Sequence, residues 1–557
     1  MGPLPLWLTA GLAAVAVSLA AVIIRYLLAT KRPKDFPPGP PTLIGIGNLH
    51  QIPLKQPFLQ FHEWSKTYGD IVGLKIGSSN LVVLHSAQYV RELFEKRGSI
   101  YSGRPYSYVH VEHVYREHAD KHLLNLQNGP YLRQWRAASS SLLGPAGVRQ
   151  TIPMQEVTSA RLIHELLQAT PSKPLEHFKS WALSTPLLAI TGQRLENRGK
   201  AFSDRHFSAQ QQWIELLEPG SAPLAAVVPF LRWVPERFAS WKGKARCVRQ
   251  YMLEEYYGFL KSAKELSNSA DDSPKTSGYV PTKYRCLMTK INEESEAEER
   301  KGGRRPFNGD QIAYLGGSLL DAAVGTTWAT TMSFILLMAA YPDVQAKARE
   351  EIDRVSTDKP PGSEVLARLR YLKASLLEML KAGLPLTNIK VYRFRPPGPH
   401  GLPHVTDHDD IFSGYKIPKG TTVLANVWAI HHNADDYDQP NEFRPERYLD
   451  NPFGLKPGVE ACEGRRATYV FGAGRRICMG EQFAENAILL AMSKLLWAYN
   501  ISAPESLDLT VETGFHTGLV LSPHPFKVDF VLRDDDRRES VILDYKEASA
   551  ALKHIGI

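Results

Sequence analysis

Residues 471–480 read Phe-Gly-Ala-Gly-Arg-Arg-Ile-Cys-Met-Gly and carry the most informative pattern of the chain. Glycines at positions 472, 474 and 480 permit close backbone approach and unusual φ values around a single cysteine, Cys478. An amphipathic helical pattern starts directly afterwards, so the sulfur of Cys478 is expected near a positive helix end, which favours thiolate over thiol. With the neighbouring Arg475 and Arg476, this arrangement suits a thiolate that ligates a metal.

The other cysteines indicate no second site of this kind. Cys247, Cys286 and Cys462 form no C-x-x-C pair, which argues against zinc, and four cysteines in 557 residues do not make a disulfide framework. We therefore expect the folded part of the chain to face the cytosol. The net charge of +8 suits an anionic membrane surface or an acidic protein partner, and no basic cluster with interleaved aromatic residues suggests nucleic acid.

The N-terminal segment predicts a membrane anchor. Residues 5–24 carry no charge, and at about 1.5 Å per residue they span roughly the 30 Å of a bilayer's hydrocarbon core. Basic residues follow from Arg25, so the positive-inside rule places the rest of the chain on the cytoplasmic side. We assign residues 1–30 to a single-pass anchor and the basic, Pro-rich residues 31–42 to a stiff hinge. The alternative is a cleaved secretory signal peptide.

The next part of the chain alternates short strands with helical stretches up to about residue 266. Strands are expected at residues 71–76 and 81–84. Residues 267–299 are polar and charged and are interpreted as a surface connection.

Residues 311–341 contain one charged side chain, Asp321, and are long enough to cross a membrane. Their internal glycines and threonines favour a long helix buried inside the protein instead. Asn308 or Asp310 can cap its start, and Pro342 ends the pattern.

Towards the C-terminus we expect a strand at residues 423–430 and a helix at 481–499, whose apolar residues recur with helical spacing. Residues 534–557 begin with a run of charges and continue as a weakly amphipathic tail to which the sequence assigns no role. Helices outnumber strands throughout.

The ten residues quoted above resemble the signature of the cytochrome P-450 superfamily, Phe-x-x-Gly-x-Arg-x-Cys-x-Gly, with matches at Phe471, Gly474, Arg476, Cys478 and Gly480. The resemblance extends from the Pro-rich hinge to about residue 532. It implies a mainly α fold with small β-sheets over residues 43–533, and haem b (iron protoporphyrin IX) as the cofactor. By resemblance Cys478 is the axial iron ligand, Arg476 pairs with a haem propionate and Phe471 packs beside the sulfur. The alternative is a structural Gly-rich turn around a buried cysteine.

The resemblance implies two further haem contacts. Trp135 lies in a segment similar to the helix whose Trp meets a haem propionate, although Ser139 stands where the family often has a basic residue. His432 matches a position that often carries a propionate-binding Arg or His. The simpler alternatives are a core Trp and a surface His.

The first departure from the family concerns oxygen activation. The usual acid-threonine pair aligns with Gly325 and Thr326, so the threonine is retained and the acid is absent. Asp321 lies one turn before Gly325 and could relay protons through water, and hydroxyl groups of the substrate are another route. The alternative is that Asp321 makes a hydrogen bond within the core.

The second departure is a break between two salt-bridge partners. By resemblance, Glu378 and Arg393 belong one helical turn apart and complete a network with Arg447, yet residues 379–390 separate them. Gly383 and Pro385 would break a helix there. We interpret these twelve residues as mistranslated non-coding sequence or a gene-model error. The alternatives are a tolerated bulge, or a weaker pair of Glu378 with Lys381, which lacks the bidentate fork of Arg.

The resemblance implies a monooxygenase that uses O2 and electrons from NADPH, supplied by NADPH-cytochrome P-450 reductase, to oxidise a small lipophilic molecule. It further suggests a fungal secondary-metabolite pathway and a location at the endoplasmic reticulum membrane, with the catalytic domain facing the cytosol. One alternative keeps the fold but performs NADPH-independent rearrangement, dehydration or peroxygenation. Another is a haem-poor, non-catalytic membrane protein.

Overall fold

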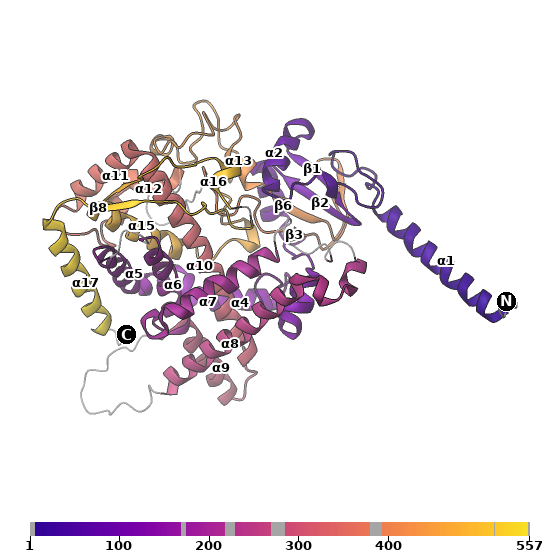
Figure 1. Cartoon of the computed structure of the whole chain (residues 1–557), viewed down its shortest axis with the longest axis horizontal. Coiled ribbons are helices and arrows are strands. Elements are labelled where there is room, and N and C mark those ends of the chain that lie inside the picture. The colour runs from indigo at the N-terminus through magenta and orange to yellow at the C-terminus, as the bar shows by residue number, and fades with distance from the viewer. Residues whose placement is uncertain are drawn as a thin grey trace.

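Helix α10 (Gly309–Ala340) runs through the interior of the computed structural model (Figure 1). Asn308 caps it, because its side chain accepts a hydrogen bond from the backbone N–H of Gln311 at 2.9 Å and the Gln311 side chain accepts one from the N–H of Asn308. Pro342 opens α11 directly afterwards. Most side chains of α10 are buried, which confirms the predicted core helix.

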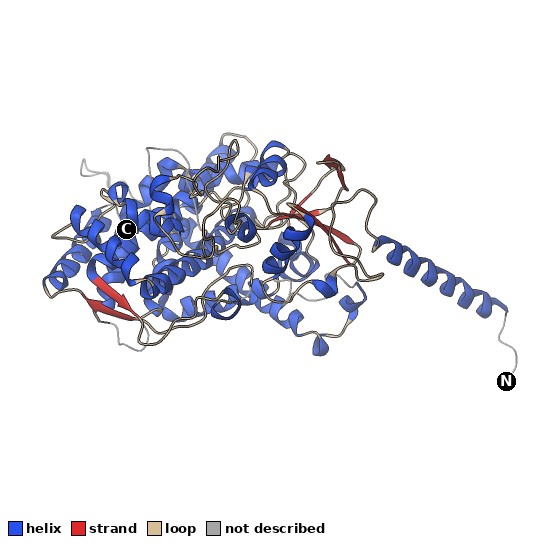
Figure 2. Cartoon of the chain, turned by 90° about the horizontal axis from the view of Figure 1, so that it is seen from above, coloured by secondary structure: helices blue, strands red, loops and turns tan. Residues whose placement is uncertain are grey.

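The structure describes residues 6–168, 174–217, 225, 229–268, 285–378, 393–516 and 518–554. The chain is mainly helical with small sheets, as predicted (Figure 2). Besides α10, the described helices are α1 (Leu6–Ala29), α2 (Pro57–Tyr68), α3 (Ala87–Val90), α4 (Pro130–Leu143), α5 (Pro145–Leu166), α6 (Glu176–Thr191), α7 (Leu195–Glu215), α8 (Ser240–Asn268), α9 (Leu287–Arg300), α11 (Pro342–Val355), α12 (Arg370–Glu378), α13 (Val427–His431), α14 (Arg447–Asp450), α15 (Glu481–Ala498), α16 (Val511–Gly514) and α17 (Asp536–His554).

The strands form small sheets from segments far apart in the chain. They are β1 (Ile71–Ile76), β2 (Ser79–Leu84), β3 (His404–Val405), β4 (Asp410–Phe412), β5 (Tyr415–Ile417), β6 (Thr422–Ala425), β7 (Tyr499–Ser502) and β8 (Asp529–Leu532). The largest described sheet has the order β1-β2-β6-β3, in which β2 and β6 run parallel and the other pairs antiparallel. The strands predicted at 71–76 and 81–84 are therefore confirmed.

Helix α10 joins two apolar cores. Its first half packs with α8 and α9 in one cluster, and its second half packs with α12 and α15 in another. Gly316 and Gly317 allow the close packing, because a Cβ there would overlap Met288 of α9 and the ring of Tyr256 of α8.

The N-terminal helix α1 projects from the body beside the four-stranded sheet (Figure 1). Residues 10–29 have a mean hydropathy of 2.3 and are exposed, as a membrane-crossing helix would be. The predicted hinge is not a free spacer. The backbone N–H of Gly73 in β1 donates to the carbonyl oxygen of Pro38 at 2.8 Å, and Arg32 donates to the carbonyl oxygens of Pro37 and Pro40 at 2.6 and 3.0 Å.

Two predictions of secondary structure were wrong in part. The predicted surface connection at residues 267–299 contains α9, which buries one face that includes Leu287 and Ile291; residues 269–284 lie outside the described part of the chain. The predicted strand at residues 423–430 ends at Ala425. There the Asn426 side chain accepts a hydrogen bond from the N–H of Ala429 at 3.2 Å and starts α13.

The predicted C-terminal tail forms α17, which packs on α5 and α15. Its Asp544 carboxylate accepts hydrogen bonds at 2.7 and 2.8 Å from Lys494 of α15, whose side chain is 1% exposed. Glu156 of α5 lies 3.6 Å from the same ammonium group. A buried ion pair thus fastens the tail to the helix that follows the cysteine motif.

We expect Asp544→Ala to lower the midpoint of thermal denaturation. Removing one partner of a buried ion pair leaves an uncompensated charge, at a cost of up to roughly 3 kcal/mol, and Glu156 offsets part of it. Glu547→Ala, at an exposed position of the same helix, is the matched control. Equal melting of both variants would contradict a structural role for the pair.

Candidate functional site

The cysteine loop, residues 471–480, is closed by a hydrogen bond at 2.8 Å from the N–H of Cys478 to the carbonyl oxygen of Phe471. Gly474 has a φ of +61°, and a Cβ there would overlap the carbonyl oxygen of Phe94 in the short helical segment η2 (Arg91–Lys96). Only glycine satisfies both conditions. Cys478 is exposed and α15 begins at Glu481, so the loop presents a thiol just ahead of a helix N-terminus.

Arg476 extends from this loop to a second basic residue, Arg104. Nε of Arg476 donates to the carbonyl oxygen of Ser102 at 2.8 Å, and Nη1 of Arg104 donates to that of Pro403 at 2.5 Å. Nη1 of Arg476 and Nε of Arg104 are buried with no hydrogen-bond partner among the described residues. Burial, with repulsion from Arg476 as a second cause, lowers the pKa of Arg104 to about 9, and burial lowers the pKa of Arg476 to about 10.

His404 completes a basic cluster with Arg104 and Arg476. Its ring stacks on Phe94 with centroids 4.0 Å apart, and its Nδ1 donates to the carbonyl oxygen of Tyr101 at 2.6 Å. Burial, and then the charge of Arg104, hold the pKa of His404 well below its usual value. The cluster therefore combines two charged arginines with a neutral imidazole at pH 7.

Helix α4 packs against the cysteine loop. Nη1 of Arg136 donates to the carbonyl oxygen of Ile477 at 3.0 Å. The adjacent Trp135 is 1% exposed, and its Nε1 is buried with no acceptor among the described residues. The surroundings of the loop thus hold open N–H donors on Arg104, Arg476 and Trp135.

Residues 37–530 match the family model described as cytochrome P450. The chain belongs to the cytochrome P450 family. It is 35% identical over 544 residues to the cytochrome P450 monooxygenase grgG of Penicillium sp, with 94% of this chain and 93% of the relative covered. It is 33% identical to drtD of Aspergillus calidoustus over 98% and 94% of the two chains, and 30% identical to virE of Hypocrea virens over 94% and 90%. The chain is therefore a P450 oxidoreductase of the monooxygenase type.

The residues around the cysteine loop fit the haem-thiolate cofactor of P450 enzymes. A cysteine thiolate is the axial ligand of P450 haem, and Cys478 is an exposed thiol on a loop held by glycines and by η2. Haem carries two carboxylates. The open donors of Arg104, Arg476 and Trp135 provide the charge-assisted hydrogen bonds that such carboxylates need.

Sequence reasoning missed Arg104 and His404. A Gly-Arg-Pro and a Leu-Pro-His triplet carry no local sign of a shared site. They meet because the N–H of Val405 donates to the carbonyl oxygen of Gly103 at 3.1 Å, next to the pairing of β3 with β6.

His432 is not brought to this basic cluster. Its ring stacks on Trp428 with centroids 3.7 Å apart, and the charges that depress its pKa, after burial, are those of Arg393 and Arg395. Its Nε2 is buried and has no partner within the described ranges. His404 lies beside Arg476 and His432 does not, and the contact of His432 with a haem propionate stays a prediction.

Thr326 lies on the turn of α10 that carries exposed side chains. Ala322 and Thr326 are exposed, whereas the helix is buried before and after them, so accessible space reaches the helix at the junction of its two cores. The hydroxyl of Thr326 donates to the carbonyl oxygen of Ala322 at 2.9 Å.

Asp321 points towards α8. Its carboxyl group accepts a hydrogen bond from the hydroxyl of Tyr256, and the residue is 7% exposed. Burial raises the pKa of Asp321 to about 7, and the Tyr256 hydrogen bond offsets only part of that rise. This contact supports the reading in which Asp321 joins two helices within the core.

Arg393 and Arg447 meet on the segment before α14. Arg393 is fully buried and donates to the carbonyl oxygens of His431 and Glu442 at 3.1 and 2.9 Å, and Arg447 donates to that of Asp438 at 2.7 Å. Residues 379–392 and the side chain of Glu378 lie outside the described part of the chain, so the interrupted salt bridge stays a prediction.

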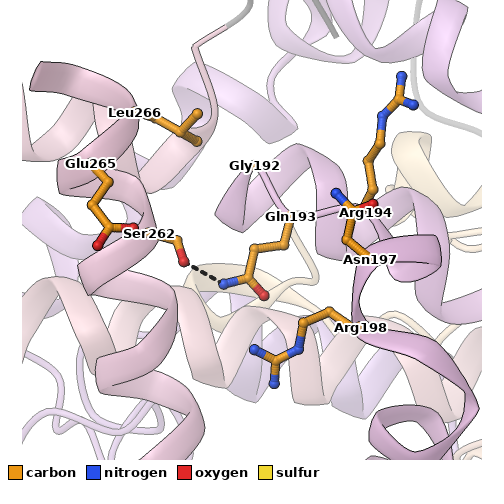
Figure 3. Close-up of a pocket in the computed structure, with 8 residues that line it drawn as sticks. All are labelled: Gly192, Gln193, Arg194, Asn197, Arg198, Ser262, Glu265 and Leu266. Carbon is orange, nitrogen blue, oxygen red and sulfur yellow. Dashed lines mark hydrogen bonds between the residues drawn. The ribbon is translucent and has the colours of Figure 1, made fainter. Parts of the chain in front are cut away.

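A cavity of about 370 Å³ lies between the end of α6, the start of α7 and the end of α8 (Figure 3). The Gln193 side chain crosses it and donates to the hydroxyl of Ser262 at 2.7 Å. Its lining shares no residue with the cysteine loop or with α10, so this cavity is separate from the reaction site.

We expect Arg476→Leu to lower the haem content of the purified protein, because it removes an open donor and a positive charge. Arg475→Leu, at the exposed neighbouring position, is the matched control. The ratio of Soret to protein absorbance measures the loss. Equal haem retention in both variants would show that Arg476 does not hold the group.

We also expect Asp321 to make stability pH-dependent. Its folded pKa lies above its usual value, so its contribution to stability is present below about pH 4 and is lost as the pH rises through about 7. The melting temperature of Asp321→Asn minus that of the parent should therefore rise between about pH 4 and pH 7 and stay constant above that range.

Asp343→Asn, an exposed carboxyl on α11, serves as the control for this measurement. Parallel melting profiles of the parent and Asp321→Asn would contradict a protonated carboxyl in the core.

Proposed function

We propose that the chain binds haem b through Cys478 and inserts one oxygen atom from O2 into a small lipophilic molecule. Electrons come from NADPH through NADPH-cytochrome P450 reductase. The observation that carries the proposal is the exposed Cys478 on a Gly-rich loop, beside buried basic side chains with open donors. The family match and relatives named as monooxygenases support it.

The residues of the site fall into groups with different tasks. The bound haem supplies the redox chemistry, and its thiolate ligand favours O–O cleavage. Phe471 and Gly480 are the two ends of the cysteine loop that carries Cys478. The carboxylate edge of the cofactor would be oriented by Arg104, Arg476, His404 and Trp135. Thr326 holds water or a proton donor on the oxygen side, because its hydroxyl lies on accessible surface in the middle of a buried helix.

We further propose the cellular setting. Residues 1–30 anchor the chain in the endoplasmic reticulum membrane, residues 31–42 dock the catalytic domain of residues 43–533 close to it, and that domain faces the cytosol. Exposed α1 and the hydrogen bonds of the hinge support this arrangement. The fungal relatives favour a secondary-metabolite pathway, and the net charge of +8 suits an acidic reductase surface.

Gly325 keeps a second candidate open: NADPH-independent rearrangement, dehydration or peroxygenation on the same fold. The acid that commonly assists proton delivery is absent, and reactions of that kind need no delivery of protons to O2. Products that form without NADPH and without the reductase would support this second candidate over the first.

The test is expression with the reductase, followed by comparison of metabolites with the Cys478→Ala variant. We expect a reduced-CO Soret band and NADPH-dependent products from the parent, and neither from Cys478→Ala. Thr326→Val should keep the band while more NADPH is lost to hydrogen peroxide. Thr331→Val, whose buried hydroxyl donates to the carbonyl oxygen of Thr327 at 2.8 Å, is its control.

A parent protein without the band would contradict the proposal and favour a haem-poor, non-catalytic membrane protein.

A further inference from the structure

The place of the missing acid on α10 is occupied by a side chain from another helix. A Cβ built on Gly325 would lie 3.0 Å from Oε1, 3.2 Å from Cδ and 3.3 Å from Nε2 of Gln210. Gln210 belongs to α7 and is 6% exposed. Its amide group therefore fills the volume in which a side chain at position 325 would begin.

A hydrogen bond holds this amide against α10. Nε2 of Gln210 donates to the carbonyl oxygen of Asp321 at 2.5 Å, one helical turn before Gly325. Within the described residues, the Gln210 side chain makes this hydrogen bond through Nε2, and its Oε1 accepts none. Oε1 is therefore an open acceptor. A carbonyl oxygen with no protein donor is a suitable acceptor for ordered water.

The register between the two helices is fixed next to this contact. Phe207, one turn before Gln210, packs edge-on against Trp328 of α10 with ring centroids 6.2 Å apart. The ammonium group of Lys179 in α6 lies 5.9 Å and 5.6 Å from the centres of these rings. Three helices thus place Gln210 opposite Gly325, on the turn that also carries Thr326.

We propose that Gln210 is a positioning residue that replaces the missing acid as the hydrogen-bonding group beside Thr326. Gly325 and Thr326 both keep accessible surface, so water can reach this turn. An amide does not ionise at neutral pH. Gln210 therefore orients the water that gives up the proton, and the solvent restores that proton. This inference rests on the proposed function, because it assigns a role in proton delivery to O2.

The test uses the haem-loaded, full-length chain with the reductase and NADPH, and needs no known substrate. Two electrons and two protons convert O2 to hydrogen peroxide, whereas four of each convert it to two molecules of water. Proton delivery at the turn that carries Thr326 would favour the reduction of O2 to water over the release of hydrogen peroxide. The measured quantity is the ratio of hydrogen peroxide to water formed per NADPH oxidised.

We expect Gln210→Leu, which nearly keeps the volume but removes the amide, to raise this ratio about fivefold, as for the loss of a hydrogen bond worth about 1 kcal/mol. The double variant Gln210→Ala with Gly325→Asp should restore the parent ratio, because it returns a polar group to the same turn. Gln211→Leu, an exposed residue of the same type on α7, should leave the ratio unchanged.

An unchanged ratio in Gln210→Leu would overturn the proposal, as would failure of the double variant to restore it. If Gln210 had a purely structural role, Gln210→Leu and the double variant would both melt at a lower temperature, and the double variant would not restore the parent ratio. Each variant must show the reduced-CO band, so that loss of haem is not mistaken for loss of proton delivery.

A second measurement tests the contact without any turnover. Gly325→Ala should raise the melting temperature in the Gln210→Ala background, because alanine favours helix over glycine. In the parent the same change should gain less or lose stability, since the new Cβ meets the Gln210 amide. Equal shifts in both backgrounds would overturn the contact.

Failure of the proposed function would appear in the parent itself, as no CO band and no NADPH oxidation, and would remove this inference with it. Failure of the inference alone would appear only in the variants.

Discussion

The main constraint on the region around the cysteine loop is that two positively charged guanidinium groups are buried there and no protein carboxylate pairs with them among the described residues. Arg104 and Arg476 lie beside each other, form no salt bridge within the described residues, and donate instead to backbone carbonyl oxygens. Burying a guanidinium group costs several kcal/mol unless it is paired. The carbonyl oxygens meet part of this cost. A bound group with two carboxylates would meet the rest, so cofactor binding and the stability of this region are expected to be coupled.

This constraint shapes the elements nearby. The cysteine loop can approach the basic cluster only because Gly474 packs against the backbone of Phe94 in η2, and Phe94 also stacks on His404. Helix α4 closes another side through Arg136. On the oxygen side of the proposed site, α10 passes from one apolar core into the other. Its accessible turn at Thr326 lies where the two cores meet. Different neighbours thus hold the cysteine loop and the turn that carries Thr326: η2 and α4 pack against the loop, whereas the two apolar cores hold α10.

Local patterns predicted the elements whose signals are local. The buried helix after Asn308, the helix after Gly480 and the first two strands were found from periodicity and capping residues. The prediction of a surface connection at residues 267–299 was wrong in part, because α9 has more charged residues than apolar residues on the face that it buries. The strand at 423–430 was too long because the capping role of Asn426 was not recognised.

The sequence by itself determined the cysteine loop of the candidate site, because residues 471–480 contain the turn glycines, Cys478 and two arginines in a single segment. Only the tertiary structure decided what surrounds them. Arg104 donates to carbonyl oxygens about 300 residues further along the chain. Gln210 fills the space next to Gly325, which lies more than 100 residues after it in the sequence. Such partners are selected by shape and hydrogen bonding across helices and strands. They leave no periodicity, so only the structure shows that His404 stands beside Arg476 and that the Gln210 amide stands where the acid is missing.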